Sequence, residues 1–343
     1  MQITAQIKLV PTDEQRALIL STLREYIRCT NEIASQMFSI DDYGNFTSKN
    51  TVANLPSALK NQCCRDAKSV FRKYKKGLVE VLPRLKKPCA IWNNQNYTIT
   101  EDSLSFPVWN TKSTKITVKA LITDEAFKLL TTHKLGTLRI TVKNNKIIAQ
   151  IAYEKREPSI IEGQAMGVDL GLKCPAVSYT EDGKVQFFGN GRKNKFIRRK
   201  FYTKRKKLGK NKKLNAIKKA NNKEQRIMKD MDHKLSREIV NYAKSNGVSL
   251  IKLEELNNIY SSTRKSRKNE RNLHNWSFYR LAHFIEYKAK LEGIEVVFVN
   301  PAYTSQVCPI CGTLNKATDR HYKCSCGFHS HRDIVGAMNI CAN

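Results

Sequence analysis

The sequence predicts an α/β domain preceded by a β-barrel-like unit that has helices inserted into it. Residues 90–153 are dominated by short strand patterns, and helical periodicity fills most of the region before them. From about residue 165 onward, strands are followed by helices and then by strands again, which is typical of an α/β domain. The length of 343 residues is sufficient for two or three domains with a sizeable core.

The N-terminal region begins with a strand and continues with two helices. Residues 2–10 alternate as a strand does and end at Pro11, and Thr12 begins a helix that extends to about Phe38. A second helix is predicted over residues 56–76. Apolar residues recur at helical spacing in both, namely Ile19, Leu23, Ile27, Ala34 and Met37 in the first and Leu59, Cys63, Ala67, Val70 and Phe71 in the second.

The next region is predicted to be a set of short strands, with Asn144-Asn145 as a turn. The N-terminal strand is expected to complete this barrel-like unit, so that the two helices form an insertion in it. Residues 155–164 have the composition of a linker. The predicted strands are 96–100, 115–118, 138–142 and 147–151.

The α/β domain is predicted to begin with a three-stranded meander over residues 166–169, 175–179 and 185–189. The later elements are a helix with apolar residues at Ile227, Met231, Leu235, Ile239 and Ala243, a strand at 249–253, a helix from Ser277 through Leu291 that ends at Gly293, and a strand at 294–299. No internal repeat is evident in the sequence.

The strong positive charge of the chain indicates a polyanionic partner. There are 61 Lys and Arg against 30 Asp and Glu, a formal net charge of +31, and each neutralised phosphate of a nucleic acid releases counterions. Residues 192–219 hold 15 Lys and Arg and no acid, which favours nucleic-acid contact over a solvated helix surface. A second basic patch of the same kind consists of Arg264, Lys265, Arg267, Lys268 and Arg271.

Three aromatic residues lie inside the basic run 192–219. Phe196, Phe201 and Tyr202 could stack on bases, but we favour their forming the core-facing side of the helix.

The sequence gives no indication of membrane insertion or export. There is no run of about 18 apolar residues, and the first residues do not form a signal peptide. We therefore expect a cytoplasmic protein with reduced thiols and no membrane partner. Its ten cysteines are then metal ligands or buried thiols rather than a disulfide framework.

Three acidic residues lie at the ends of predicted elements. Asp169 ends an apolar strand, Glu254 ends a second, and Asp333 opens the last helical segment. A two-metal phosphodiesterase needs such carboxylates from separate elements, and their hard oxygens suit Mg²⁺ or Mn²⁺. Each acid could also be an ordinary strand-end residue or helix cap. Glu255 is an alternative to Glu254, because strand alternation alone does not decide between them.

Two close cysteine pairs predict a tetrahedral zinc site. Cys308 and Cys311 are separated by two residues, and Cys324 and Cys326 by one, which is tighter than usual. A histidine (His321, His329 or His331) could replace one sulfur, and a redox pair is the competing interpretation. The cysteines outside this pattern, namely Cys29, Cys63, Cys64, Cys89, Cys174 and Cys341, are expected to be small core residues.

Several ordered motifs resemble one known family. They are Gly-Val-Asp-Leu-Gly (167–171), His-Lys-Leu-Ser-Arg-Glu-Ile-Val (233–240), Ile-Lys-Leu-Glu-Glu-Leu (251–256), Tyr-Lys-Ala-Lys-Leu-Glu-Gly-Ile (287–294), Pro-Ala-Tyr-Thr-Ser-Gln-Val-Cys-Pro-Ile-Cys-Gly (301–312) and Asp-Ile-Val-Gly-Ala-Met-Asn-Ile (333–340). Together they resemble the TnpB/OrfB proteins of insertion sequences, which are RNA-guided DNA endonucleases related to type V CRISPR effectors. The resemblance is specific over residues 165–343 and weaker near the N-terminus.

The resemblance implies an architecture as well as an activity. It implies an RNase H-like (RuvC) nuclease domain over residues 159–302 and 331–343, with a zinc-binding target-strand insertion at 303–330. It also implies a wedge β-barrel over residues 1–11 and 89–158, with a helical recognition lobe inserted at 12–88.

The resemblance also implies the site residues and the partners. It assigns Asp169, Glu254 and Asp333 as the metal-binding catalytic acids, and so prefers Glu254 to Glu255. It implies a guide RNA transcribed from the transposon end, double-stranded target DNA, a short target-adjacent motif and a nucleoid-associated protein that is monomeric on its RNA. Many members have Asn two residues after the last acid, where this chain has Val335.

We assign a set of side chains to nucleic-acid contact, although any one of them could be an ordinary solvated residue. They are Lys60, Asn61, Gln62, Arg65, Arg198, Arg199, Lys204, Arg205, Arg264 and Arg267. Two other functions remain open for the whole chain. One is an RNA-guided DNA-binding repressor with an inactive nuclease, against which the three retained acids argue. The other is a strand-transfer transposase, which would also use an acidic metal triad.

Overall fold

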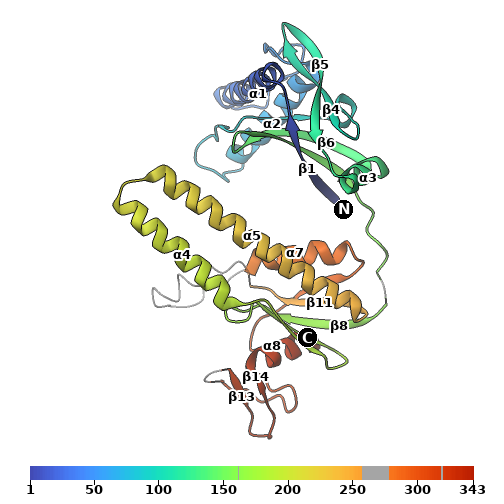
Figure 1. Ribbon diagram of the computed structural model, residues 1–343, viewed down its shortest axis with the longest axis vertical. Coiled ribbons are helices and arrows are strands. Elements are labelled where there is room, and N and C mark those ends of the chain that lie inside the picture. Colours follow the sequence, from blue (N-terminus) through green and yellow to red (C-terminus); the bar gives the residue numbers. More distant parts are fainter. Residues whose placement is uncertain (161, 257–277, 318–319) are drawn as a thin grey trace. The chain divides into compact units, whose positions relative to one another are not determined.

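The computed structural model of the protein describes residues 1–160, 162–256, 278–317 and 320–343 (Figure 1). The chain divides into two compact units, Met1–Arg156 and Glu157–Asn343, and the division lies within the segment 155–164. The second basic patch, which includes Arg264 and Arg267, lies outside the described residues, as does Ser277. No helix in the described ranges is both long enough and apolar enough to span a bilayer.

The first unit is built on a seven-stranded antiparallel sheet with the order β2-β6-β7-β1-β5-β4-β3 (Figure 1). Strand β1 (Gln2–Val10) lies at its centre and pairs with β7 and β5, so the prediction that the N-terminal strand joins these strands is confirmed. The other strands are β2 (Cys89–Trp92), β3 (Thr98–Ile99), β4 (Ser103–Asn110), β5 (Lys112–Leu121), β6 (Lys134–Lys143) and β7 (Lys146–Glu154).

The two edge strands of this sheet are consecutive in the sequence. Only the short helix η1 (Asn94–Asn96) separates β2 from β3, and the Trp92 indole donates to the Pro107 carbonyl of β4 at 2.9 Å. The sheet is therefore rolled, although no strand pairing joins β2 to β3 within the described residues. The predicted turn is confirmed, because Asn144 and Asn145 have φ of 50° and 63° between β6 and β7, as a two-residue hairpin turn requires.

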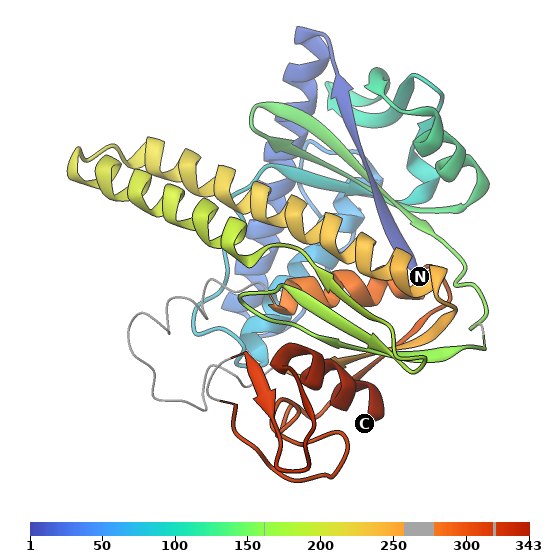
Figure 2. The same ribbon diagram turned by 60° about the horizontal axis from the view of Figure 1, so that its bottom comes forward.

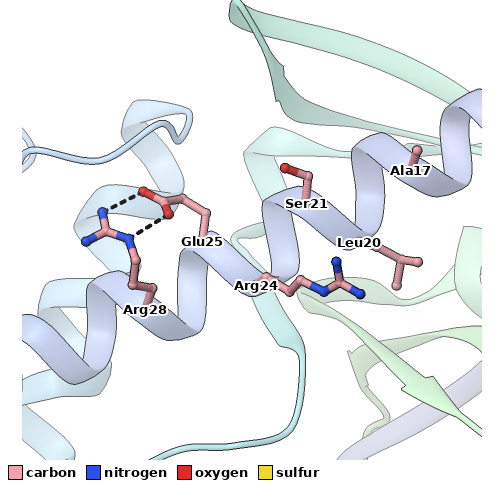
Figure 3. A pocket seen from close by; sticks show the side chains of 6 residues that line it. All are labelled: Ala17, Leu20, Ser21, Arg24, Glu25 and Arg28. Atoms are coloured by element: carbon pink, nitrogen blue, oxygen red, sulfur yellow. Dashed lines mark hydrogen bonds and ion pairs between the residues drawn. The ribbon is translucent and has the colours of Figure 1, made fainter.

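Two predicted helices pack together and onto the sheet of the first unit. In α1 (Asp13–Ser39), Thr12 and Gln15 form a reciprocal capping box. Helix α2 (Ser57–Lys75) buries Leu59, Cys63 and Phe71 against it. Both predicted helices are confirmed. A groove of about 550 Å³ on α1 is bordered by a Glu25–Arg28 pair at 2.8 Å and by Leu20 (Figure 3).

The prediction of strands alone for residues 90–153 is wrong at one place. Helix α3 (Asp124–Thr132) interrupts the strands, capped by the Thr123 hydroxyl, which accepts from the Ala126 amide. Its nine residues are too few to show a clear periodicity, so its capping residue and the two acids of its first turn were the available signal.

The second unit contains a five-stranded sheet with the order β10-β9-β8-β11-β12. The predicted meander is confirmed as an antiparallel set, and β11 and β12 then run parallel to β8. The strands are β8 (Gln164–Asp169), β9 (Ala176–Thr180), β10 (Val185–Phe188), β11 (Val248–Glu254) and β12 (Glu295–Val299).

Helices cover both faces of this sheet. Helix α5 (Leu214–Ser245) and α7 (Phe278–Lys290) bury Leu235, Ile239 and Ile285 with Met166 and Val168 of β8. Because strand residues alternate between faces, Gly167 and Asp169 point to the opposite face, where α8 (Arg332–Ala342) lies. Helix α4 (Gly191–Lys210) forms an antiparallel hairpin with α5 that extends beyond the sheet (Figure 2). Of the predicted α5 stripe, Ile227 and Met231 are only half-buried.

Candidate active site and metal centre

Two of the predicted acids lie side by side at the end of the parallel strands. The parallel pairing of β11 with β8 ends at Leu253 and Val168, so Glu254 and Asp169 are the next residues of the two strands. Adjacent strands lie roughly 4.8 Å apart, and both strands end here at the same edge of the sheet. This local geometry places both carboxylates where a ligand can approach the sheet end.

The third acid is brought to the same place by the contact of α8 with β8. A β-carbon at Gly167 would lie 2.2 Å from the Ala337 carbonyl oxygen, and one at Gly336 would lie 3.0 Å from Asp169 Oδ2. Glycine at both positions therefore lets the helix lie directly on the strand. Asp333 is one turn before Gly336 on the same helix face, so its carboxylate points toward Asp169.

Burial raises the pKa of two of these carboxyl groups. Burial is the main cause that raises the pKa of Asp169 to about 8, and the negative charges of Glu254 and Asp333 add to it. Burial also raises the pKa of Glu254, while a hydrogen bond from the Thr304 hydroxyl opposes this shift. Perturbed carboxyl groups gathered at the end of a sheet are typical of a functional site rather than of isolated strand-end residues.

Cationic side chains balance part of this negative charge. The Arg320 guanidinium donates to both oxygens of Asp333, and the charges of Arg320 and Arg332 act to lower the pKa of Asp169. Among the described residues, the four zinc-candidate cysteines form the only set of three or more His, Cys, Asp or Glu whose ligand atoms all lie within 4.8 Å of one another. The three carboxylates are thus near one another, but their oxygens do not all lie within 4.8 Å. Arg320 binds Asp333, so a divalent cation would compete with Arg320 for this carboxylate.

The donor set still suits divalent cations. Three carboxylates supply hard oxygen ligands. The raised pKa of Asp169 favours its protonated form, and a bound cation would lower this pKa and favour the carboxylate. Arg320 and Thr304 were missed by sequence reasoning. Thr304 lies in the motif Pro-Ala-Tyr-Thr-Ser-Gln, which was a signal for it, whereas nothing local in the sequence marks Arg320.

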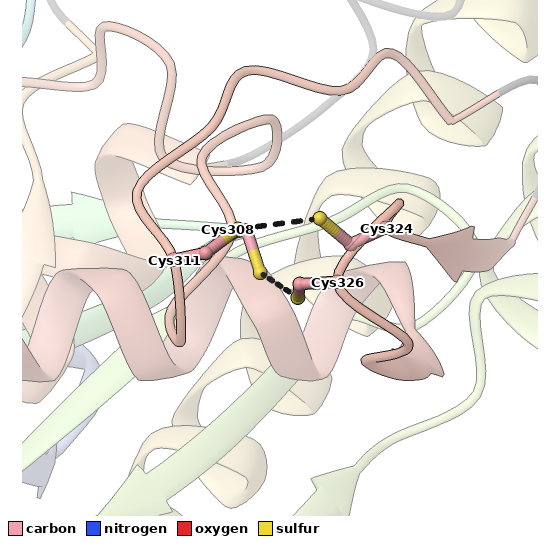
Figure 4. A group of neighbouring side chains, drawn as sticks. All are labelled: Cys308, Cys311, Cys324 and Cys326. Carbon is pink, nitrogen blue, oxygen red and sulfur yellow. Dashed lines mark hydrogen bonds between the residues drawn. The ribbon is translucent and has the colours of Figure 1, made fainter.

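The four predicted cysteines come together beyond the end of β12. Cys308 and Cys326 have their sulfurs 3.7 Å apart, and Cys311 and Cys324 have theirs 3.4 Å apart (Figure 4). Four sulfurs at about 2.3 Å from a tetrahedral zinc would be roughly 3.8 Å from one another, so the spacing fits such an ion. The second pair lies in the turn between β13 (His321–Lys323) and β14 (His329–His331).

Polar contacts favour the thiolate form of Cys324 in this cluster. The hydrogen bond with the Thr313 hydroxyl is the main cause that lowers the pKa of Cys324 to about 5. The Asn315 amide donates to the same sulfur at 3.1 Å. His331 is the N-cap of α8 and packs on Phe187 at 5.4 Å, and no histidine joins the cysteine set in the described ranges.

The remaining cysteines and Val335 have structural surroundings. Cys29, Cys63, Cys64 and Cys341 are buried, as predicted, while Cys89 and Cys174 are half-buried. Val335 is fully buried and packs with Cys308 and Tyr322, so it joins the cysteine cluster to α8. A valine at this position therefore serves the hydrophobic contact beneath the cluster.

The predicted basic surface of α4 divides into two kinds of residue. Arg198 and Arg205 are half-buried and form ion pairs with Glu224 of α5, so they hold the hairpin together. Arg199 and Lys204 are exposed. The sequence could not distinguish the two ion-paired residues from the two exposed ones, because Glu224 lies beyond the basic run and contacts it only in the folded hairpin.

The aromatic residues of α4 differ in the same way. Phe201 is buried, as predicted, but Phe196 is 66% exposed and Tyr202 is 46% exposed. The prediction that all three form the core side of the helix is therefore wrong for Phe196 and Tyr202. Both residues lie just outside the side of α4 that faces α5, because α4 contacts α5 through a narrow stripe only.

The four predicted contact residues of α2 are likewise not equivalent. Arg65 is exposed and Lys60 is half-buried. Asn61 accepts from the Ser48 amide at 3.2 Å, and the Gln62 amide donates to Asp66 at 2.9 Å. Asn61 and Gln62 thus take part in the local fold through these hydrogen bonds.

Comparison with known families agrees with the motifs in the sequence. Residues 149–260 match the family model described as a probable transposase, OrfB_IS605, and residues 278–340 match the Cas12f1-like TNB domain. These matches confirm the resemblance of this chain to the TnpB/OrfB proteins and to Cas12f.

Individual relatives show the same similarity. The chain is 39% identical to the TnpB-like protein MJ0751 of Methanocaldococcus jannaschii over 123 residues, which are 35% of this chain and 44% of that protein. It is 28% identical to the CRISPR-associated endodeoxyribonuclease Cas12f1 of Sulfoacidibacillus thermotolerans over 218 residues, 58% of this chain and 50% of that protein. The matched segments thus span about half the length of these curated relatives.

Solved structures show that the fold is shared. The chain matches a Cas12f1 chain from a complex with sgRNA and target DNA with a TM-score of 0.74 and 16% identity, covering 99% of this chain and 98% of that one. It matches the mini-RNA-guided endonuclease CRISPR-Cas_phi3 with a TM-score of 0.57 and 12% identity, covering 100% and 92%. The mixed α/β fold is that of Cas12-type proteins.

Proposed function

We propose that this protein is an RNA-guided endonuclease that cuts double-stranded DNA in an RNase H-like (RuvC) site. The observation that carries the proposal is the convergence of Asp169, Glu254 and Asp333, with the pKa of Asp169 raised to about 8 by burial and by its acidic neighbours. Three such carboxylates at one sheet edge are suited to phosphodiester hydrolysis with divalent ions.

The topology of the second unit supports the RNase H-like assignment. Its sheet has three antiparallel strands followed by two parallel ones, and the acids lie at the ends of β8 and β11 and at the start of α8. We assign residues 159–302 and 331–343 to this nuclease domain and residues 303–330 to a zinc-bearing insertion. The rolled sheet of the first unit corresponds to a wedge barrel over 1–11 and 89–158, with a recognition lobe at 12–88.

Each side chain of the site has a distinct task in the proposed reaction. Asp169, Glu254 and Asp333 would hold two Mg²⁺ or Mn²⁺ ions, which supply a hydroxide nucleophile and stabilise the leaving oxygen. Thr304 orients Glu254 through its hydroxyl. Arg320 is free to contact the phosphate once Asp333 binds cations, because its guanidinium suits phosphate as well as carboxylate.

Guidance by RNA is supported by charge and by the relatives. A net charge of +31 suits a chain that holds a large RNA together with DNA. The curated Cas12f1 relative is an endodeoxyribonuclease, and the solved Cas12f1 chain comes from a complex with sgRNA and target DNA. Pairing with a guide would supply the sequence specificity that a small protein lacks, while the protein reads a short target-adjacent motif. We propose a guide derived from the transposon end and a monomeric complex.

The test is DNA cleavage by the protein purified with its RNA. The Asp169→Asn variant keeps the side-chain shape and removes the charge, so cutting should fall by at least about 1000-fold. Asp230→Asn, on the exposed face of α5, is the matched control and should cut normally. Persistent cutting by Asp169→Asn would end the proposal, and the lack of any discrete copurifying RNA would end its guided part.

A strand-transfer transposase is the second candidate, because the OrfB_IS605 model is described as a probable transposase. The two reactions differ in their products. Adding a labelled transposon end to the cleavage reaction should give cut DNA alone if the protein hydrolyses the phosphodiester. Covalently joined end and target would support strand transfer instead.

A further inference from the structure

The last helix contacts the segment that carries Thr304 through one asparagine side chain. Asn339 lies on α8, three residues after Gly336. Its side-chain amide donates to the Thr304 carbonyl at 2.7 Å and to the Val307 carbonyl at 2.8 Å. Asn339 therefore uses both of its N–H donors on one short segment of the chain, residues 304–307.

The segment held by Asn339 carries the hydroxyl group that contacts Glu254. Thr304 is buried, and its hydroxyl donates to the Glu254 carboxylate. The bond from Asn339 to the Thr304 carbonyl fixes the backbone from which this side chain extends. Asn339 thus acts on Glu254 indirectly, through the orientation of Thr304.

The backbone just before Thr304 has a conformation that needs support from its surroundings. Tyr303 has a φ of 62°, in the left-handed region that a bulky residue rarely adopts. The amides of Gln306 and Val307 both donate to the Tyr303 carbonyl, at 2.8 and 3.0 Å, so the segment is a tight turn. Such a strained turn persists only where neighbouring contacts hold it, and Asn339 supplies two of them.

We propose that Asn339 is a positioning residue for the divalent-cation site, and that it holds Glu254 in place by clamping the turn at residues 304–307. The proposal rests on the nuclease function proposed above and names a further residue of the same site. The second bond of the clamp, at Val307, lies directly before Cys308 of the cysteine cluster. The clamp therefore joins the cation site to the start of the zinc-candidate hairpin.

This assignment gives α8 a contact with each of the three acids. The helix carries Asp333, and Gly336 lets it lie against Asp169. Asn339 extends its influence to Glu254 by way of the clamped turn. A ligand set is most effective when the groups around it fix its geometry, and α8 would do so for the whole site.

The first test measures metal binding rather than cleavage. The electron paramagnetic resonance signal of unbound Mn²⁺ gives the affinity, with Asp169→Asn as the reference in which the site itself is damaged. Asn339→Ala should bind Mn²⁺ about 10-fold more weakly than the parent protein, at the lower end of the loss that follows removal of a ligand's supporting partner. Equal Mn²⁺ affinity in Asn339→Ala and the parent would overturn the proposal.

A double variant tests whether Asn339 acts through Thr304. Once Thr304→Val has removed the hydroxyl, adding Asn339→Ala should weaken Mn²⁺ binding by less than about twofold, because two changes in one chain of contacts are not additive. A further loss of about 10-fold in the double variant would mean that Asn339 affects the site by another route. That result would refute the clamp as the cause.

Asn31→Ala is the matched control for a general loss of stability. Asn31 of α1 also holds a distant segment, because its side chain donates to the Leu85 carbonyl at 2.9 Å and accepts from the Leu85 amide at 2.8 Å. This variant should lower the unfolding temperature but leave Mn²⁺ affinity unchanged. Equally weakened Mn²⁺ binding in Asn31→Ala and Asn339→Ala would reduce Asn339 to a general stabilising contact and overturn the proposal.

Hydrogen exchange tests the clamp itself in the absence of added divalent ions. The Gln306 and Val307 amides should exchange faster in Asn339→Ala than in the parent protein, because the turn that protects them loses two hydrogen bonds. Unchanged exchange would refute the clamp. A parent protein whose Mn²⁺ binding is the same as that of Asp169→Asn would instead end the proposed cation site, and the exchange rates would still decide whether Asn339 holds the turn.

Discussion

Gly336 of α8 lies against the carboxylate of Asp169, so close that a β-carbon at this glycine would be 3.0 Å from Asp169 Oδ2. The contact seats the helix that carries Asp333 directly on the strand that carries Asp169. The distance between two of the proposed catalytic acids is thus set by the absence of a side chain. Gly336 does no chemistry, yet the geometry of the site depends on it.

Replacing Gly336 by alanine should reduce cleavage more than stability. The added methyl group must displace the Asp169 carboxylate or the helix, and we expect a loss of about tenfold or more in cleavage rate. Alanine favours a helix over glycine by up to about 1 kcal/mol, which offsets part of the steric cost to folding. Rates and thermal unfolding of the purified variant measure the two effects. Gly209→Ala in α4, where a β-carbon would meet no atom within 4 Å, should leave cleavage unchanged.

The metal-free protein should be more stable with Asp169→Asn than without it at pH 7. The pKa of Asp169 is about 8 in the folded chain and about 4 in an unfolded one, so its contribution to stability is fully present below pH 4 and is lost as the pH rises toward 8. An asparagine has no such loss, and we expect a gain of roughly 1–4 kcal/mol. Denaturant unfolding in EDTA at pH 5 and pH 7 checks this, and a smaller difference at pH 7 than at pH 5 would contradict it.

Thr304→Val should weaken divalent-ion binding without removing a ligand. The Thr304 hydroxyl donates to Glu254 and so holds its carboxylate in place. Loss of a partner that orients a ligand typically costs about 10- to 100-fold in metal affinity. Titration of cleavage with Mg²⁺ should show a higher half-saturating concentration for Thr304→Val and a near-normal one for Thr304→Ser. An unchanged Mg²⁺ requirement in the valine variant would exclude this role.

Cys308→Ser should release zinc from the purified protein. Cys308 is 1% exposed and packs with Tyr322 and Val335. Replacing it therefore removes a zinc ligand and destabilises the hairpin of β13 and β14. Zinc content should fall from about one equivalent to near zero, with a lower unfolding temperature. Cys89→Ser, a half-buried cysteine of the other unit, should keep its zinc. Equal zinc content in the two variants would disprove the assignment.

Local patterns identified the elements and the acids, but not the contacts between them. Thr12 and its neighbours marked the start of α1, and Asp169 and Glu254 could be selected because each ends an apolar run. That Glu254 lies beside Asp169 depends on the parallel pairing of β11 with β8, which joins residues far apart in the sequence. Resemblance to a family supplied what local pattern could not.

Other features were invisible because they arise only from packing. Arg320 is one basic residue among many, and only the folded hairpin places it on Asp333. Arg198 and Arg205 appeared equivalent to Arg199 until Glu224 was found opposite them on α5. Aromatic character alone also misplaced Phe196 and Tyr202, because α4 has a narrower buried stripe than its aromatic content suggested.

The most direct test of the account is the position of bound Mn²⁺. Crystals of the protein grown with Mn²⁺ should show anomalous density for two ions among the carboxylates of Asp169, Glu254 and Asp333, with Arg320 moved off Asp333. Crystals of the Asp169→Asn variant should lack at least one of these ions. Density elsewhere only, or no ion among the three carboxylates at saturating Mn²⁺, would contradict the claim that these acids form a metal-dependent catalytic site.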